Sequence, residues 1–477
     1  MTELELKELI EHILSIKCET KGVELKSAKH GCPEKLYDTL SSFSNTNGGI
    51  IIFGIDEKSN YEVVGIEDAQ LLQQKVTEQS LLMEPVVRPL FTIINYNKKI
   101  ICSAEIPEMD CFSKPCFYKG KGKSKGSYIR VGDMDLPMTE YEIHGFESFK
   151  FKIEDELRIK NRVDNSFLNE FLIDGYLAKL VDKKLGINSV NKNKILQLEG
   201  IINKDNKPTL CGILNFGLLP QIFAPNLDIV AVKCSTDIYA MEDDEGIRFI
   251  DSKRIDGTIK SMLQQALSFI SNNTRKSTYI NPETGKREDK EEYPLKALRE
   301  IILNALIHRD YSQYTENSPI RIEIYSDRIE ISNPGGLYGR LTINELGSTR
   351  ADIRNPYIAS ILETMEIAEN RYSGIPIIYK EMKKAGLLPP KFEDNRGVFK
   401  VTLYNSNISE SDDLSQKIID FCSQPRSKEF LAHEFGFDKN HPAYFINTYV
   451  KPLIEKGFLK YTIPDKPKSK KQKIVAA

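Results

Sequence analysis

The sequence predicts a multi-domain α+β protein. Its 477 residues exceed what one hydrophobic core accommodates, and at about 150 residues per domain three or so domains are expected. Runs with helical periodicity alternate with β-rich runs along the chain. Hydrophobic residues make up 40% and charged residues 28% of the chain, which is a globular composition.

Charge and hydropathy exclude several classes of protein. The formal net charge is −2, so any phosphate-binding surface must be a local basic patch. No apolar run approaches the ~18 residues of a spanning helix. The first 17 residues predict an amphipathic helix rather than a signal peptide, which indicates a cytoplasmic protein without membrane association. Eight scattered cysteines favour reduced thiols over disulfides and over a zinc site.

Periodicity and polar stretches give five expected segments. They are an N-terminal module (1–148), a helical connector (149–207), a second globular domain (208–406), a helical C-terminal module (412–463) after the polar run 408–415, and a basic tail (464–477).

Both large modules have an expected order of elements. In the first, strands are expected at 48–57 and 127–132, with a hairpin over 86–107. In the second, the expected elements are strands at 211–217 and 227–235, a helix at 254–272, a loop at 271–292, a helix at 294–308, strands at 319–333, helices near 355–386 and a strand at 397–405.

Three carboxylates in the N-terminal module are candidates for chemistry. Glu24 and Lys26 are two residues apart, so on a strand they face the same side. Together with Glu19 and Asp56 they predict a site for Mg²⁺ or Mn²⁺, ions that prefer oxygen ligands, with Lys26 offsetting phosphate charge. The structural alternative is a surface ion pair between Glu24 and Lys26, worth under about 1 kcal/mol.

Four motifs in this order resemble the Schlafen/AlbA-type nucleic-acid-binding domain. They are ETKGVELK (19–26), FSNTNGG (43–49), IIIFGID (50–56) and YIRVG (128–132). The resemblance implies nucleic-acid binding. It also implies, by analogy with Schlafen-type RNases, that Glu19, Glu24 and Asp56 are catalytic metal ligands of an endoribonuclease acting on structured RNA such as tRNA. Many relatives bind nucleic acid without cutting it.

The segment 119–126 is the clearest basic feature. Lys119, Lys121, Lys123 and Lys125 alternate with small residues, which predicts a flexible loop that contacts phosphates without reading bases. Tyr118 and Tyr128 flank this segment and are candidates for stacking on bases. Arg130, in the following strand, is a further candidate nucleic-acid contact. The alternative is a solvated hairpin tip.

A polar stripe runs along the helix expected at 294–308. Glu300, Asn304 and His308 are four residues apart and lie on one face, while the other face is apolar. Polar groups on a mostly apolar helix need partners, because burying them unpaired is costly.

This stretch resembles the N-box of GHKL-type ATPases, in a divergent branch similar to the RecG C-terminal domain. The resemblance implies ATP binding, with Glu300 orienting water and Asn304 holding Mg²⁺, beside His308. It extends through NPGG, which contains Asn333, Gly335 and Gly336, to Gly374. The usual Asp-X-Gly-X-Gly is absent and the Gly-X-Gly of the lid is reduced to Ser373-Gly374, which puts hydrolysis in doubt. The alternative is a scaffold without nucleotide.

The C-terminal module is expected to be a winged helix-turn-helix. Asn447–Lys451 would lie on a DNA-contacting helix, or on one used for protein contact. The five lysines of 464–473 predict a phosphate anchor or a solvated end.

Three functions follow from these patterns. The leading hypothesis is a nucleic-acid-binding protein whose nucleotide state modulates a Schlafen-type module, which would be a metal-dependent endoribonuclease in phage defence or stress. The rival is an ATP-sensing, DNA-binding transcriptional regulator without catalysis. The third is a dimeric scaffold, and the first two also allow a homo-oligomer.

Overall fold

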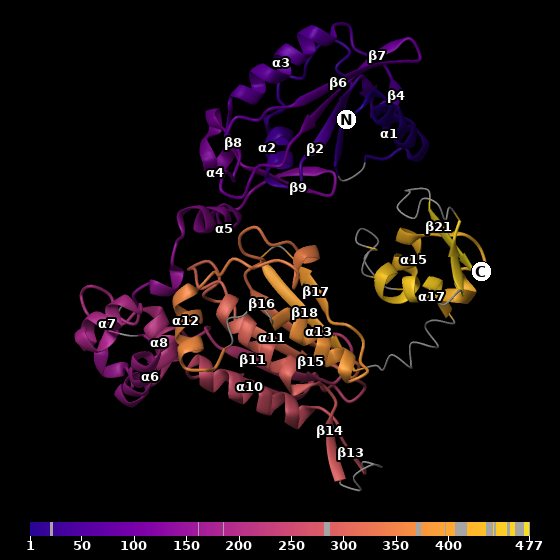
Figure 1. The fold of residues 1–477 in the computed structure, drawn as a ribbon. Coiled ribbons are helices and arrows are strands. Elements are labelled where there is room, and N and C mark those ends of the chain that lie inside the picture. Colours follow the sequence, from indigo (N-terminus) through magenta and orange to yellow (C-terminus); the bar gives the residue numbers. More distant parts are fainter. Residues whose placement is uncertain are drawn as a thin grey trace. The chain divides into compact units, whose positions relative to one another are not determined.

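The computed structural model describes residues 1–477 apart from 20–21, 161, 185, 281–286, 369–373, 396, 406–416, 436–441, 443–444, 456–457, 463–471 and 477. The chain forms two compact units (Figure 1). The first comprises Met1–Asp155 with two short returning segments, Tyr338–Leu341 and Ala351–Arg354. The second comprises the remaining residues. The expected linker 408–415 and the lid residue Ser373 lie outside the described residues.

The first unit is built on a four-stranded sheet in the order β1-β2-β7-β6. The strands are β1 (Val23–Lys26), β2 (Gly49–Phe53), β6 (Leu90–Tyr96) and β7 (Lys99–Ile106). β1 and β2 are parallel, and the other pairs are antiparallel. The expected strand after Gly48–Gly49 and the hairpin of 86–107 are confirmed.

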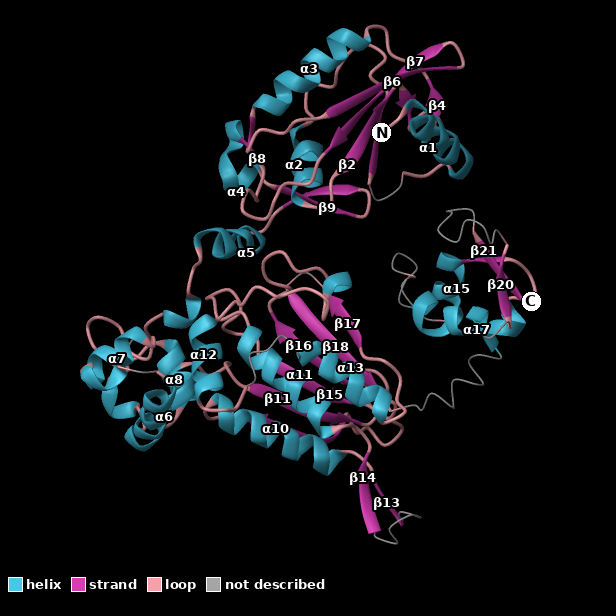
Figure 2. Cartoon of the chain, viewed as in Figure 1, coloured by secondary structure: helices cyan, strands magenta, loops and turns pink. Residues whose placement is uncertain are grey.

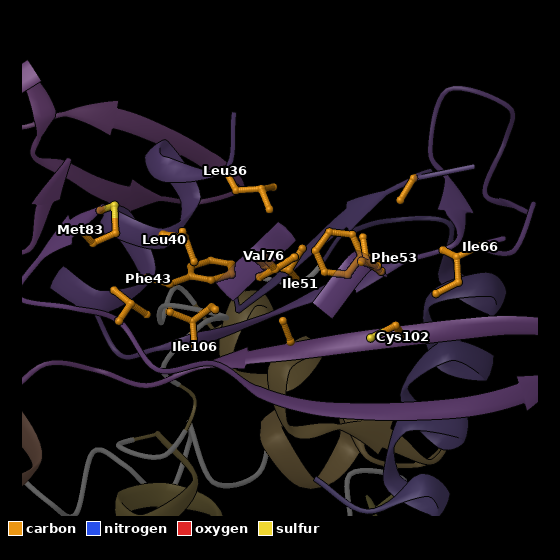
Figure 3. Close-up of a cluster of buried hydrophobic side chains, with 14 of the residues drawn as sticks. Leu36, Leu40, Phe43, Ile51, Phe53, Ile66, Val76, Met83, Cys102 and Ile106 are labelled. Carbon is orange, nitrogen blue, oxygen red and sulfur yellow. The ribbon is translucent and has the colours of Figure 1, made fainter. Parts of the chain in front are cut away.

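Helices cover both faces of this sheet. On one side, α2 (Tyr37–Asn45) and α3 (Ala69–Leu81) pack on Ile51 and Phe53 (Figure 3). On the other, α1 (Glu3–Ile16) packs on Ile52 and Leu25. Because side chains alternate along a strand, the apolar run of β2 supplies both cores.

Short elements complete the first unit around this sheet. The two-stranded pairs are β3 (Ile55–Asp56) with β4 (Glu62–Val63), β5 (Met83–Glu84) with β8 (Phe117–Tyr118), and β9 (Tyr128–Val131) with β10 (Met134–Pro137). The helices are η1 (Lys119–Lys121), α4 (Gly122–Gly126) and α5 (Glu140–Phe151).

The second unit is built on a six-stranded mixed sheet in the order β12-β11-β15-β16-β18-β17. Its strands are β11 (Ile229–Cys234), β12 (Phe249–Ile255), β15 (Ile320–Ile324), β16 (Arg328–Pro334), β17 (Lys391–Asp394) and β18 (Val398–Tyr404). The helices α10 (Ile259–Asn273), α11 (Leu295–His308) and α13 (Gly374–Lys384) lie across one face (Figure 2). In β16, buried Ile329 and Ile331 alternate with half-buried Arg328 and Glu330, so one face of the sheet is apolar and the other polar.

Two expectations for this unit were wrong. The run 211–217, expected as a strand, is the helix α8 (Leu210–Phe216), whose first turn is capped by the Thr209 hydroxyl. All of its residues are buried, and a fully apolar run of this length does not distinguish a strand from a buried helix. The loop expected at 271–292 contains an antiparallel pair, β13 (Lys276–Ile280) and β14 (Arg287–Glu291).

The expected connector belongs to the second unit from Glu156 onward. Its helices are α6 (Glu170–Lys183) and α7 (Lys192–Leu198), followed by α8 and α9 (Pro220–Phe223). The fully buried Glu156 accepts hydrogen bonds from the backbone N–H groups of Tyr357 and Ile358, at 2.9 and 2.8 Å. Both residues lie in the first turn of α12 (Pro356–Thr364), where a carboxylate stabilises the unpaired N–H groups.

The C-terminal residues follow the expected order of helices and wing. A helix at 417–421 is followed by α15 (Lys428–Glu434), η6 (Ile446–Val450) and α17 (Lys451–Glu455). A small sheet has the order β19-β21-β20, from Arg426–Ser427, Lys473–Ala476 and Leu459–Tyr461. Lys473–Ala476 pairs with both other strands, so these residues of the expected basic tail belong to the fold. Residues 464–471 of that tail lie outside the described part of the chain.

Within the part of the chain that the structure describes, no helix combines the length and apolarity needed to cross a membrane.

Two glycines give a matched test of this packing. A Cβ added to Gly212 in α8 would lie 2.1 Å from the Ile201 carbonyl oxygen, whereas one at the exposed Gly175 in α6 would meet nothing within 4 Å. We expect Gly212→Ala to lower the free energy of unfolding by about 1–3 kcal/mol through overpacking. Gly175→Ala should raise it by about 0.5–1 kcal/mol through lower backbone entropy. Differential scanning calorimetry of both variants checks this, and equal melting temperatures would contradict it.

Candidate nucleic-acid and nucleotide sites

A buried arginine organises the polar cluster of the first unit. The Arg130 side chain is 2% exposed, and its Nη1 lies 2.8 Å from a Glu24 oxygen and 2.9 Å from an Asp135 oxygen. Its Nη2 lies 3.9 Å from a Glu19 oxygen and donates to the Val23 carbonyl at 3.2 Å. The guanidinium therefore holds three carboxylates together. The sequence predicted that Arg130 contacts nucleic acid, but its guanidinium is buried and not available to a phosphate.

Asp135 is the member of this cluster that the sequence interpretation missed. It lies opposite Arg130 in the antiparallel pair of β9 and β10. Its carboxylate also accepts hydrogen bonds from the hydroxyls of Thr39 and Ser42 in α2. The signal for it was present, because Gly132-Asp133 between two β-rich runs is a two-residue hairpin turn.

Glu24 and Lys26 form the expected pair on β1. The Lys26 ammonium lies 2.5 Å from a Glu24 oxygen, and both side chains are on one side of the strand, as the two-residue spacing predicted. Glu24 therefore contacts two cations, Lys26 and Arg130.

Glu19 is held at the edge of this cluster. It accepts a hydrogen bond from the Leu25 N–H at 2.7 Å. Burial raises the pKa of Glu19 to about 7, and the neighbouring carboxylates Glu24 and Glu57 add to the rise, whereas the Leu25 N–H and Arg130 oppose it. Such a carboxyl group titrates near neutral pH.

Asp56 makes different contacts. Its carboxylate accepts hydrogen bonds from the Lys58 N–H and the Ser59 hydroxyl, at 3.2 and 2.7 Å, in the turn after β3. No group of three or more His, Cys, Asp or Glu side chains among the described residues could hold a metal ion. The structure thus brings Glu19 and Glu24 together around Arg130 and does not gather them with Asp56 into a metal site.

The lysine segment is helical and not a flexible loop. It forms η1 and α4, and two of its glycines pack closely: a Cβ on Gly120 would lie 2.6 Å from the Tyr118 ring, and one on Gly126 would lie 2.6 Å from the Tyr118 carbonyl oxygen. Lys123 is ion-paired with Glu147, and Lys121 donates to the Tyr128 hydroxyl at 3.0 Å.

The other two lysines of this segment are exposed. Among the described residues, the Lys119 ammonium donates to the Leu81 carbonyl at 3.5 Å, and Lys125 lies in the last turn of α4. They are the members of the segment best placed to meet a phosphate.

The flanking tyrosines are not free to stack on bases. Tyr118 stacks on Tyr37 at 4.4 Å between ring centroids, and Lys121 lies 4.5 Å from the centroid of Tyr37. Tyr128 is buried. These rings support the position of the lysine segment.

In the second unit, Glu300 and Asn304 face the start of α13. A Cβ on Gly374 would lie 3.1 Å from both a Glu300 carboxylate oxygen and the Asn304 amide nitrogen. Gly374 is the first residue of α13, so Glu300 and Asn304 of the polar stripe lie beside a helix N-terminus. His308, the last residue of α11, is not among the atoms nearest Gly374. Helix N-termini favour anions such as phosphates.

The NPGG segment ends β16. Asn333 is buried, and its Oδ1 accepts no hydrogen bond from the described residues. Gly335 adopts φ +103° and donates its N–H to the Gly397 carbonyl at 2.7 Å. A Cβ on Gly336 would lie 2.6 Å from Oδ1 of Asp394. The other oxygen of this carboxylate accepts a hydrogen bond from the Leu337 N–H at 3.0 Å. Asp394 on β17 is a neighbour that the motif did not indicate.

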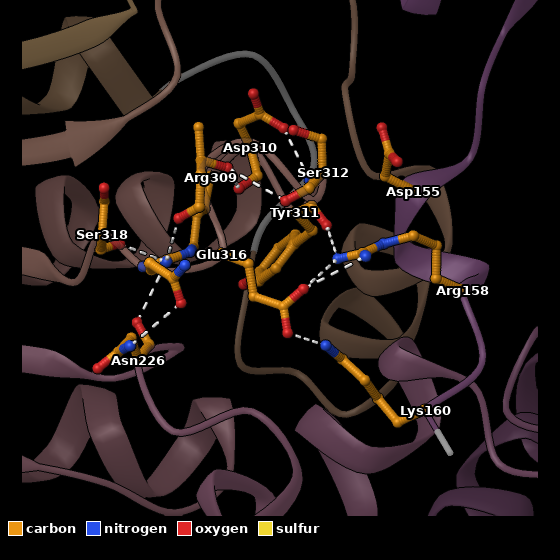
Figure 4. Close-up of polar contacts among 12 residues, drawn as sticks. Asp155, Arg158, Lys160, Asn226, Arg309, Asp310, Tyr311, Ser312, Glu316 and Ser318 are labelled. Carbon is orange, nitrogen blue, oxygen red and sulfur yellow. Dashed lines mark hydrogen bonds and ion pairs between the residues drawn. The ribbon is translucent and has the colours of Figure 1, made fainter. Parts of the chain in front are cut away.

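The residues after α11 are structural. The buried Arg309 donates through Nη2 to the carbonyls of Asn226, Thr315 and Ser318 (Figure 4). Nearby, Glu316 pairs with Arg158 and Lys160. This network fastens the chain after α11 to the segment that follows Glu156.

Three family models match separate parts of the chain. Residues 19–139 match Schlafen, AlbA_2. The chain carries an AlbA_2 domain. Residues 317–403 match the putative ATP-dependent DNA helicase recG C-terminal family, a HATPase model, and 422–474 match the C-terminal domain of the filamentation induced by cAMP protein Fic-like family. The sequence-based recognition and fold class are thus confirmed, although α11 lies outside the matched range. The AlbA_2 and HATPase domains together indicate a nucleic-acid-binding, ATP-associated protein.

Two solved structures are also similar. A crystal structure of a protein from Corynebacterium diphtheriae is 17% identical, with 95% of this chain and 92% of that chain covered and a TM-score of 0.40. The solution structure of the N-terminal domain of a putative ATP-dependent DNA helicase RecG-related protein from Nitrosomonas europaea is 24% identical, with 28% of this chain and 92% of that chain covered and a TM-score of 0.22. No curated protein sequence matches the chain.

The raised pKa of Glu19 predicts a pH-dependent stability difference. Its pKa rises from 4.5 to about 7 in the folded chain, so folding favours the protonated form. The wild type should therefore lose stability relative to Glu19→Gln as pH rises through this range, by on the order of 2 kcal/mol at pH 8. Below pH 4.5 the difference should vanish.

Urea denaturation between pH 4 and 8 measures this difference. The exposed Glu11→Gln is the matched neutralisation and should show no such divergence. A constant offset between wild type and Glu19→Gln across the series would contradict the prediction.

Proposed function

We propose that this chain is a nucleic-acid-binding regulator in which the AlbA_2 domain binds the sugar-phosphate backbone and the HATPase domain binds ATP with Mg²⁺. The observation that carries the proposal is the helical lysine segment of the AlbA_2 unit, where Lys119 and Lys125 are exposed on a packed support. The proposal extends to RNA or DNA as the partner, to a cytoplasmic location and to a homo-oligomer.

The lysine segment favours binding without sequence readout. Lys119 and Lys125 contribute charge and no stacking ring. Of the two tyrosines expected to stack on bases, Tyr118 is stacked on Tyr37 and Tyr128 is buried. Phosphate contacts of this kind position a protein on nucleic acid and do not specify sequence. The AlbA_2 unit is therefore expected to bind unrelated sequences with similar affinity.

The α11–α13 contact supports nucleotide binding. Glu300 and Asn304 present an oxygen and an amide beside Gly374 at the start of α13, where phosphate groups would meet backbone N–H groups. Asn304 would hold Mg²⁺, Glu300 and His308 would line the same site, and Asn333, Gly335 and Gly336 would border it at the end of β16. Bound ATP would place its negatively charged phosphates at this helix N-terminus, and in the proposed regulator its presence would change the nucleic-acid affinity of the protein.

A metal-dependent endoribonuclease is the second candidate function. It is favoured by the neutral-range pKa of Glu19, because shifted carboxyl groups cluster at catalytic sites. It is disfavoured by Arg130, whose guanidinium lies between the carboxylates that a cation would need. Incubation of the protein with an RNA pool and Mn²⁺ tests the nuclease function. RNA fragments that form with the wild type but not with Glu24→Ala would establish this function. RNA that stays intact with the wild type would rule it out in favour of the regulator.

We expect the double variant Lys119→Ala/Lys125→Ala to bind unrelated nucleic acids more weakly. The slope of log affinity against log salt should flatten by about 0.7–0.9 per lost contact. Lys7→Ala/Lys58→Ala removes the same charge from exposed positions elsewhere in the unit and should leave the slope unchanged. Fluorescence anisotropy over a salt series measures both. Equal slopes for the two double variants would refute the assignment of these lysines.

We expect ATP with Mg²⁺ to raise the melting temperature of the wild type, because a ligand stabilises the state that binds it. Asn304→Ala should lose this shift. Lys296→Ala, at an exposed position of the same helix, should keep it. Thermal denaturation with and without ATP checks the prediction. If ATP does not raise the melting temperature of the wild type, the domain is a scaffold that binds no nucleotide.

A further inference from the structure

The outer strand of the second sheet presents an open edge. β12 pairs with β11, and no other described strand pairs with it. Ile250 to Arg254 are all exposed, and the register shift at Lys233–Cys234 leaves Ile250 as the bulged residue, so Asp251–Ile255 is regular. An exposed edge carries unpaired N–H and C=O groups that can bind another strand.

Apolar side chains accompany this edge. The segment between β11 and β12 folds back on itself, since the Ser235 N–H donates to the Arg248 carbonyl and the Asp243 N–H donates to the Ile247 carbonyl. Four large apolar residues of this segment and of β12 are 42–65% exposed: Ile238, Met241, Ile247 and Ile250. Ile250 lies on β12 itself, so a second strand paired with this edge would cover apolar surface there.

The charge pattern of β12 selects a partner. Asp251 and Lys253 are each one residue from Ser252 and lie on the same face of the strand. If two β12 strands pair antiparallel about a two-fold axis at Ser252, each Asp251 lies opposite Lys253 of the other copy, and Ser252 lies opposite Ser252. Antiparallel pairing is what a two-fold axis imposes on identical strands.

We propose that β12 is the interface through which two copies of this chain associate, by antiparallel pairing about Ser252. The two sheets then continue across the axis, and two Asp251–Lys253 pairs fix the register. The proposal is independent of the nucleic-acid and nucleotide functions.

Charge exchange tests the interface in the full-length chain. In Asp251→Lys, and equally in Lys253→Asp, two attractive cross-strand pairs become two repulsive ones. The dimer dissociation constant of each variant alone should rise about tenfold or more. An equimolar mixture of the two variants restores opposite charges at both pairs, so it should form heterodimers with near wild-type affinity. The variant carrying both changes should again form homodimers.

Sedimentation velocity over a concentration series measures these states, and circular dichroism shows that each variant is folded. Because Asp251 also accepts a hydrogen bond from Asn273 at 2.8 Å, Asn273→Ala is the matched control and should dimerise like the wild type. Three results would overturn the proposal: a wild type that stays monomeric, a dimer that neither single variant weakens, or a mixture that does not recover.

Discussion

Three carboxyl groups with little access to water surround the Arg130 guanidinium in the first unit, and this buried cation offsets part of their negative charge. It contacts Glu24 on β1 and Asp135 on β10, and it approaches Glu19. Removing it would leave uncompensated buried charges, a loss of about 3–5 kcal/mol in comparable buried pairs. The packing of β9 and α2 against the main sheet therefore depends on this one cation.

The position of Arg130 also limits metal binding by these carboxylates. A guanidinium and a divalent metal compete for the same carboxylate oxygens, and here the oxygens of Glu24 are shared between Arg130 and Lys26. Asp56, the third acid of the expected set, is bound by its own turn. The proposed nucleic-acid contact needs none of these acids, because Lys119 and Lys125 lie on a different segment of the unit.

The second unit also contains buried charged side chains, and these are held by hydrogen bonds to backbone groups. The fully buried Glu156 caps α12, and Arg309, directly after α11, donates to the carbonyls of Asn226, Thr315 and Ser318. These contacts hold both ends of the segment from α11 to α12. On α11 itself, Glu300 and Asn304 lie beside Gly374, the first residue of α13, where a Cβ would approach both side chains to 3.1 Å.

Local patterns determined most of the architecture. The capped helix α1, the strand β2, the hairpin β6–β7 and the apolar face of α11 follow from periodicity and turn residues, and the two-residue spacing predicted the Glu24–Lys26 contact. Tertiary structure decided the rest. The buried helix α8 looked like a strand, Asp135 displaced Asp56 from the cluster, and Arg130 became an internal counter-ion. The physical reason is that spacing fixes which side of an element a residue occupies, whereas its charge partner is set by burial and by residues distant in the chain.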